Sequence, residues 1–173
     1  NYTSIQDAVN NAADGDTIEI YSGQYDEAVV VNRSLSLTGI DTGTGLPVIN
    51  ASGAEFGVTL ESPDTLLYRL NITGANSSAI LMQNDGAELL ELMIVHHKEE
   101  HRELTYPAVT GENITDISIS ACTFDVSQDT IALYDPQDYS ITGNTFLNPV
   151  GYSVAIISSD SMIPTTNGVI SVS

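Results

Sequence analysis

The chain has 173 residues, which suits one domain, and 42% of them are hydrophobic, which is enough for a continuous core. Asp and Glu outnumber Lys and Arg by 23 to 4, so the formal charge is -19. This charge argues against binding to nucleic acid or anionic lipid. No run reaches the roughly 18 apolar residues of a membrane span, so no membrane insertion is expected. The acidic surface is interpreted either as a solubilising one or as one that supports cation-dependent assembly of like subunits.

The first segment predicts an amphipathic helix. Thr3 and Gln6 have the spacing of a capping box, and apolar residues follow at helical intervals from Ile5. The run Asp14-Gly15-Asp16 ends the pattern. Residues 1–15 are therefore predicted to form a capping helix that covers the first strands, whose unpaired edges would otherwise recruit another chain.

Strand patterns begin after this helix and become periodic further along. Residues 17–21 and 28–31 are the first predicted strands. The run Leu67–Ile72 returns at residues 89–94, and the run Ile117–Phe124 returns at residues 139–146, so both pairs have the same offset. A fixed period in the twenties indicates a solenoid, in which each repeat buries its apolar face against its neighbours.

The repeat has the pattern of strands, because apolar residues alternate within it and Gly, Asn, Asp or Pro separates the runs. At roughly 3.3 Å per residue, one repeat has a perimeter near 70 Å, enough for three short strands joined by bends. The sequence thus predicts an all-β fold, a parallel β-helix of six to seven coils over residues 16–173.

The opening of the chain supports this fold through a resemblance to known proteins. The runs that carry it are Tyr2–Val9, Gly15–Ile18, Ser22–Glu27, Leu35–Gly39 and Val48–Asn50. They resemble the start of right-handed parallel β-helix proteins related to pectin lyases, most of all the NosD-like and archaeal cell-surface branch. The similarity runs from the N-terminus to just beyond Asn50 and, more weakly, includes the pattern at residues 141–146. It implies a right-handed coil and export from the cell.

One insertion interrupts the repeat. The step from Ile80 to Val109 is longer than the step from Val58 to Ile80, so extra residues protrude within residues 95–104. This segment contains His96, His97 and His101, and the last two have a spacing that lets them face one way on a helical turn. They are candidate ligands for zinc or copper, with Glu100 as a further donor. The alternative is a charged, solvated loop.

Six N-x-S/T sequons and one cysteine favour an extracellular protein. The candidate glycosylation sites are Asn1, Asn32, Asn50, Asn71, Asn76 and Asn113. Cys122, the single cysteine, is interpreted either as a small buried side chain or as the source of an intersubunit disulfide.

A catalytic cluster is not evident. Lyases of this fold, as the resemblance implies, hold calcium with carboxylates and place an arginine or lysine nearby. Here Arg69 lies one repeat before Glu91 and is predicted to be its stacked salt-bridge partner, while Arg33 falls in a bend. The sequence therefore predicts no enzyme, no catalytic residues and no cofactor beyond a divalent cation.

The chain ends on alternating strand patterns at residues 153–157 and 168–172, with no closing helix. An open strand edge allows copies to add to one another. The sequence is therefore interpreted as a cell-surface sheath or layer subunit that assembles with copies of itself, as a glycoprotein of archaeal type. The first alternative is a carbohydrate-binding or carbohydrate-cleaving β-helix, with cell-surface polysaccharide as partner and Tyr106, Tyr134 and Tyr152 stacking on sugar rings. The second is a metal-handling, NosD-like protein.

Overall fold

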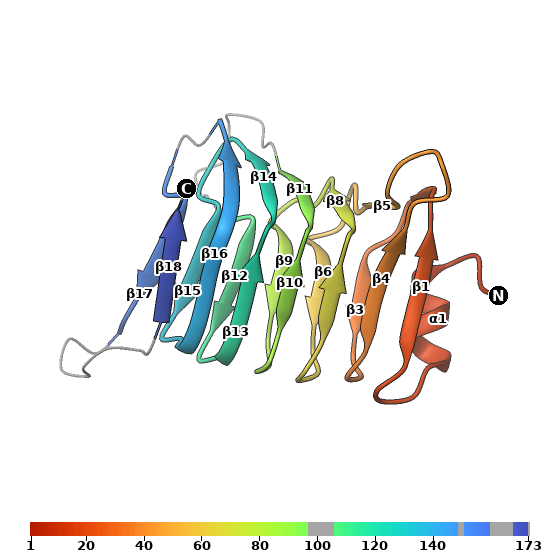
Figure 1. The fold of residues 1–173 in the computed structure, drawn as a ribbon, viewed down its shortest axis with the longest axis horizontal. Helices are drawn as coiled ribbons and strands as arrows, with labels where there is room; N and C mark the ends of the chain where they lie inside the picture. Colours follow the sequence, from red (N-terminus) through yellow and green to blue (C-terminus); the bar gives the residue numbers. More distant parts are fainter. Residues whose placement is uncertain (97–105, 149–150, 160–167, 173) are drawn as a thin grey trace.

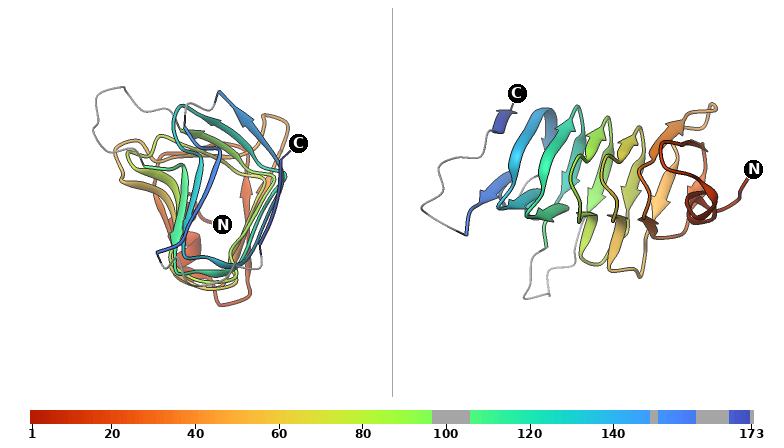
Figure 2. Two further views of the ribbon diagram at one scale, coloured as in Figure 1. Left: turned by 90° about the vertical axis from the view of Figure 1, so that its left-hand side faces the viewer. Right: turned by 90° about the horizontal axis from the view of Figure 1, so that it is seen from below.

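The chain winds into a column of stacked coils in which all strand pairs of the described residues are parallel (Figure 1). The computed structural model describes residues 1–96, 106–148, 151–159 and 168–172. Seen along the column, the coils superpose into a three-sided outline (Figure 2). Each side is a parallel sheet, and we call the three sheets A, B and C. The predicted parallel β-helix is thus confirmed.

Successive coils add one strand to each sheet in turn, so neighbours in a sheet come from consecutive coils. Sheet A contains β1 (Thr17–Tyr21), β4 (Ser36–Ile40), β7 (Leu66–Tyr68), β10 (Glu88–Leu90), β13 (Thr115–Ser120), the first half of β16 (Gln137–Leu147) and β18 (Gly168–Val172). Sheet B contains β2 (Gln24–Tyr25), β5 (Val48–Asn50), β8 (Asn71–Thr73), β11 (Met93–His96), β14 (Thr123–Val126) and the second half of β16. Sheet C contains β3 (Val29–Val31), β6 (Phe56–Leu60), β9 (Ser78–Met82), β12 (Val109–Glu112), β15 (Ile131–Tyr134) and β17 (Val154–Ile157).

The sequence repeat is the register of these sheets. Leu67 pairs with Leu89, and Ile72 pairs with Ile94. Further along, Phe124 pairs with Phe146. The predicted repeat therefore equals one coil wherever no insertion intervenes.

The interior of the column is filled by the alternate residues that point inward. One such row on sheet A consists of Leu37, Leu67, Leu89, Ile119 and Ile141, all fully or almost fully buried. Burying one side chain of this size contributes about 1.5–3 kcal/mol. Because each coil buries its face only against its neighbours, this continuous row is what holds the coils together.

The corner between sheets A and B has the same geometry in successive coils. Arg69, Glu91 and Ala121 occupy it with φ values of 55°, 51° and 52°. The residue that follows each of them turns inward and is buried. These inward residues are Leu70, Leu92 and Cys122, followed one coil later by Asn144. A single left-handed residue therefore turns the chain sharply from one sheet into the next.

The N-terminal helix α1 (Ile5–Asn11) lies at the first end of the column and contacts β3 and β1. Its N-cap is Ser4, whose hydroxyl accepts a hydrogen bond from the Asp7 amide. The prediction that Thr3 and Gln6 form a capping box was wrong, because Glu27 from the first coil binds the free amides of Ile5 and Gln6. This leaves the Gln6 side chain available for the sheet. No helix among the residues described here is long and apolar enough to cross a membrane.

Candidate functional site

The outward side of sheet C gathers the exposed apolar side chains of the molecule. Among the described residues, eight large hydrophobic side chains are exposed, and five of them lie on sheet C or on the segments that lead into it. These five are Val30, Tyr106, Tyr134, Tyr152 and Ile157. Such gathering on one face is typical of an interaction surface rather than of scattered exposure.

Two rows of side chains make up this surface, which we call the C face. The first row is half-buried or buried, and its side chains are short except for that of Leu81. It consists of Thr59, Leu81, Thr110, Ala132 and Ala155. The second row, two residues further along each strand, is exposed and consists of Glu61, Gln83, Glu112, Tyr134 and Ile157. The residues between the two rows point inward, so both rows point outward on the same side of sheet C.

The second row places polar and aromatic groups side by side. Glu112 pairs in register with Tyr134, which pairs with Ile157. Glu61 and Gln83 extend the row, because they directly follow the paired residues Leu60 and Met82. Adjacent strands lie about 4.8 Å apart. Glu61 and Glu112, two strands apart, are therefore separated by roughly 9.6 Å between their backbones, with Gln83 between them.

Two more tyrosines lie at the other end of the sheet C strands, just before the strands begin. Tyr106 and Tyr152 precede β12 and β17, and their exposed fractions are 36% and 71%. Tyr152 is fixed by its backbone, because its amide donates to Asp129 Oδ1 at 2.7 Å and its carbonyl accepts from Thr130 at 2.8 Å. Aromatic rings with a polar hydroxyl suit a ligand that has both apolar and polar surface.

A fixed negative charge lies just past the C face. The Asp135 carboxylate accepts hydrogen bonds from the side chain and the backbone amide of Ser159, the latter at 2.7 Å, and both lower the pKa of Asp135. None of the residues that form the C face is a lysine or an arginine. Lys98 and Arg102 lie outside the described residues. The surface is therefore anionic and suits an uncharged ligand or one bridged by cations.

The histidines predicted as metal ligands are only partly placed. His96 is buried at the end of β11, while His97 and His101 lie outside the described residues. In the part of the chain that the structure describes, no group of three or more His, Cys, Asp or Glu side chains could hold a metal ion. The predicted zinc or copper site therefore stays a prediction.

Cys122 lies in the interior at the corner between sheets A and B. Its thiol contacts the carbonyl oxygens of Ser120 at 3.3 Å and Leu89 at 3.5 Å. Burial raises the pKa of Cys122 to about 11. An intersubunit disulfide through this thiol would require the corner to open, so the predicted disulfide gains no support from the position of the sulfur.

The predicted sequons differ in accessibility. Asn1, Asn32, Asn76 and Asn113 are exposed. Asn50 and Asn71 lie half-buried on the outward side of sheet B. Asn50 is also tied down, because it donates to Asp26 at 2.7 Å and accepts from the Ser52 hydroxyl at 2.7 Å. Glycosylation itself remains a prediction at all six positions.

The predicted ion pair between Arg69 and Glu91 is confirmed, with 3.9 Å between Arg69 Nε and Glu91 Oε2. The Arg69 guanidinium also lies over the Tyr68 ring, 5.9 Å from its centre. Both side chains of the ion pair are well exposed, so this pair stabilises the fold by less than about 1 kcal/mol. It lies at the corner between sheets A and B, away from the C face.

The sequence interpretation missed the row that contains Glu61, Gln83 and Glu112. The signal was present, because Gln83 follows Glu61 by one repeat and Glu112 follows Gln83 by the same longer step that carries the insertion. The three tyrosines assigned to the carbohydrate alternative do lie on or beside one face.

Comparison with known proteins finds similarity only among solved structures. No protein-family model matches the chain, and no curated protein matches it in sequence. Similar solved structures include the pectin methylesterase of Aspergillus niger in deglycosylated form, at 13% identity over 99% of this chain and 87% of that chain, with a TM-score of 0.41. A pectin methylesterase in complex with a hexasaccharide has 15% identity over 96% and 65% of the two chains, with a TM-score of 0.46. A PL6 family alginate lyase has 10% identity over 96% and 37%, with a TM-score of 0.39.

These structures correct one expectation from the sequence. The chain was predicted not to be an enzyme, yet the solved structures that it resembles are those of enzymes, two pectin methylesterases and an alginate lyase. Neither the fold nor these structures bear on assembly into a sheath. At such low identity the similarity is one of fold. The chain is a parallel β-helix, with all-parallel sheets and a single N-terminal helix in its described part.

Proposed function

We propose that the C face binds an extended polysaccharide and that the protein is a carbohydrate-cleaving β-helix. The observation that carries this proposal is the exposed row in which Glu112 lies beside Tyr134. A tyrosine ring can stack on a sugar ring while the neighbouring carboxylate reaches the glycosidic bond. Tyr106 and Tyr152 add aromatic surface where strands β12 and β17 of the same sheet begin.

Two glutamates on one face with a strand between them suit hydrolysis with inversion. Inverting glycosidases hold their two carboxyl groups about 6.5–9.5 Å apart, which leaves room for a water molecule, whereas retaining enzymes hold them about 5–5.5 Å apart. The backbones of Glu61 and Glu112 are roughly 9.6 Å apart on the same side of sheet C, and their long side chains can incline toward one another to bring the carboxyl groups into the range of the inverting enzymes. One glutamic acid would protonate the departing oxygen, and the other carboxylate would take a proton from the attacking water.

The charge of the face favours a neutral polysaccharide over a polyuronate. A lyase must neutralise the uronate carboxylate next to the carbon that loses its proton, which requires a cation. Neither arginine of the described residues lies on the C face. Arg33 donates to the Val9 carbonyl at the end of α1, and Arg69 pairs with Glu91 at the corner between sheets A and B. A neutral chain avoids the repulsion that a polyuronate would meet on this acidic surface.

We also infer that the protein acts outside the cell. The acidic composition, the single cysteine and the exposed sequons support export. Polysaccharides of cell walls and surfaces are the substrates that an exported protein would meet.

The test is release of reducing ends from a panel of neutral and acidic polysaccharides by purified protein. The Glu112→Gln variant should lower the rate by about 10²–10⁴-fold, the usual contribution of a general acid or base. Its matched control is Glu88→Gln, an exposed glutamate on the outward side of sheet A, which should keep the full rate. Equal rates for the two variants would refute the assignment of Glu112. No release from any member of the panel would refute cleavage.

A further inference from the structure

At the N-terminal end of the column, the edge strand of sheet C is covered and the edge strand of sheet A is not. At the edge of sheet C, the side-chain amide of Gln6 takes the place of a neighbouring strand. Its oxygen accepts from the Val30 amide at 2.7 Å, and its nitrogen donates to the Val30 carbonyl at 3.1 Å. In the described part of the chain the edge of sheet A has no such cover, since β1 is the terminal strand and pairs only with β4.

The free edge of β1 presents a defined set of peptide groups. The Asp16 carbonyl accepts from the Ser36 amide, and the Ser22 amide donates to the Ile40 carbonyl. The even-numbered residues of β1 therefore direct their backbone N–H and C=O groups toward β4. In a parallel ladder the alternate residues direct their backbone N–H and C=O groups away from that neighbour, so those of Thr17 and Glu19 point to the open edge. The Tyr21 carbonyl at this edge accepts from the Tyr25 hydroxyl at 3.0 Å. Unpaired edges of this kind are templates for strand addition.

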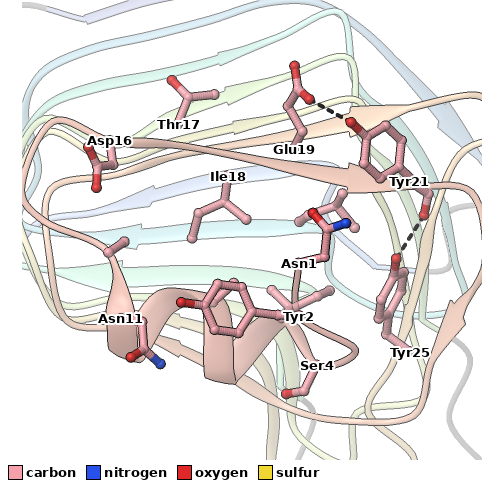
Figure 3. A pocket seen from close by; sticks show the side chains of 14 residues that line it. Asn1, Tyr2, Ser4, Asn11, Asp16, Thr17, Ile18, Glu19, Tyr21 and Tyr25 are labelled. Atoms are coloured by element: carbon pink, nitrogen blue, oxygen red, sulfur yellow. Dashed lines mark hydrogen bonds between the residues drawn. The ribbon is translucent and has the colours of Figure 1, made fainter.

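A pocket of about 630 Å³ lies between this edge and α1 (Figure 3). Its volume falls within the roughly 300–1,000 Å³ of ligand sites. Ile18 and Ile20 of β1 form one wall, and Ile5 and Ala8 of α1 form another. Asn1, Ser4 and Asn11 also line the pocket, so it is a hollow with apolar walls and a polar rim beside an unpaired strand. Extended peptides bind to such strands by adding to the sheet edge, with pockets for their alternate side chains.

The two sides of β1 define what an added strand must carry. Its inward side chains would lie beside Ile18 and Ile20 and fill the pocket, so they must be apolar. Its outward side chains would lie beside Thr17 and Glu19, which are exposed. Glu19 and Asp16 make this rim acidic, and no lysine or arginine lines the pocket. Opposite charges directly across a strand pair are stabilising, so the outward residues should be basic.

We propose that β1 is an acceptor for an extended segment of a partner protein in which apolar residues alternate with lysine or arginine. The partner strand hydrogen-bonds to Thr17 and Glu19, inserts its apolar residues into the pocket and pairs its basic residues with Glu19. A second copy of this chain fits less well, because two molecules of charge -19 repel one another.

The test uses a fluorescent peptide in which lysine and valine alternate, long enough to pair with the whole of β1, and measures binding to the whole chain by anisotropy. Binding is expected for this peptide, and loss of binding for a version whose amides are N-methylated on alternate residues, because that version cannot pair with an edge. Equal binding of the two peptides would overturn the proposal.

A charge reversal tests the position of the site. Glu19→Lys should weaken binding of the basic peptide at least tenfold and strengthen binding of a peptide with glutamate in place of lysine. Glu88→Lys, on an interior strand of the same sheet, is the matched control and should change neither. Equal effects of the two variants would mean binding to the acidic surface in general and would overturn the assignment to β1. So would displacement of the peptide by neutral oligosaccharides, or self-association of the protein in sedimentation without peptide.

Discussion

The corner between sheets A and B and the C face are built from the same coils but are constrained very differently. At the corner, residues one coil apart share backbone geometry, and the residue that follows each of them is buried. On the C face, neighbours in the exposed row are a glutamate, a glutamine, another glutamate, a tyrosine and an isoleucine. Repetition therefore serves stability, whereas the departure from repetition is where binding and chemistry can develop. Substitutions at the corner should change stability alone, and substitutions on the C face should change binding alone.

The largest effect on stability is expected for Phe124→Ala in the interior next to the corner. Phe124 is completely buried and stacks on Phe146, with ring centres 5.3 Å apart. The substitution should lower the free energy of unfolding by about 3–5 kcal/mol, because it removes apolar contacts and leaves a cavity. Chemical denaturation measures the loss. Leu147→Ala, at a side chain that is 41% exposed, is the control and should cost far less.

Asn144→Ala should have the next largest effect. The Asn144 side chain accepts from the Cys122 amide at 2.8 Å and donates to the Ile119 carbonyl at 2.9 Å, and both bonds are buried. Its removal leaves the buried Cys122 amide without this acceptor, at about 1–3 kcal/mol, and also removes the hydrogen bond to the Ile119 carbonyl, at about 1 kcal/mol. We expect a loss of about 2–4 kcal/mol in chemical denaturation. Thr145→Ala, at the next and exposed position, should be close to neutral, and an equal loss there would contradict a role for the corner bonds.

Cys122 makes the corner sensitive to alkali. Because its pKa in the folded protein is raised from 9.0 to about 11, the thiol stabilises the fold fully below pH 9 and progressively less as the pH rises through 11. At about 1.4 kcal/mol per pKa unit, wild type should lose roughly 3 kcal/mol relative to Cys122→Ala over this range. Denaturation of both proteins at pH 8 and pH 11 measures the difference, and the tyrosines that also titrate are common to both. A constant difference would mean that the thiol is accessible to water.

The corner could be predicted from the sequence and the C face largely could not. The interior row of Leu67 and Leu89 is set by a repeat that the sequence states openly. The stacked position of Cys122 and Asn144 follows from the same repeat. In each case burial fixes the register, because a slip of one residue would expose the whole inward row.

The C face depends on features that repetition does not encode. The insertion before β12 breaks the offset between Gln83 and Glu112, so their adjacency emerges only once β9 and β12 are paired. The end of the column is similar. A helix was expected there, but which edge it covers depends on Glu27 and Val30, which reach Ser4 and Gln6 from the first coil. Contacts between segments far apart in the chain decided both outcomes.

Tyr134→Ala should give the opposite result to the corner substitutions. Tyr134 is 37% exposed and lies on the outward side of sheet C, so its loss should change the free energy of unfolding by no more than about 0.5 kcal/mol. Loss of a stacked ring should weaken polysaccharide binding about tenfold, which corresponds to about 1.4 kcal/mol. Affinity electrophoresis in gels that contain the polysaccharide measures the change. Tyr134→Phe keeps the ring and should retain most of the affinity, which separates stacking from hydrogen bonding by the hydroxyl.

Tyr2→Ala, at an exposed tyrosine beside α1, is the matched control and should bind like wild type. If Tyr2→Ala weakened binding and Tyr134→Ala did not, the polysaccharide would belong to the end of the column, and the division between a stabilising corner and a binding C face would fail.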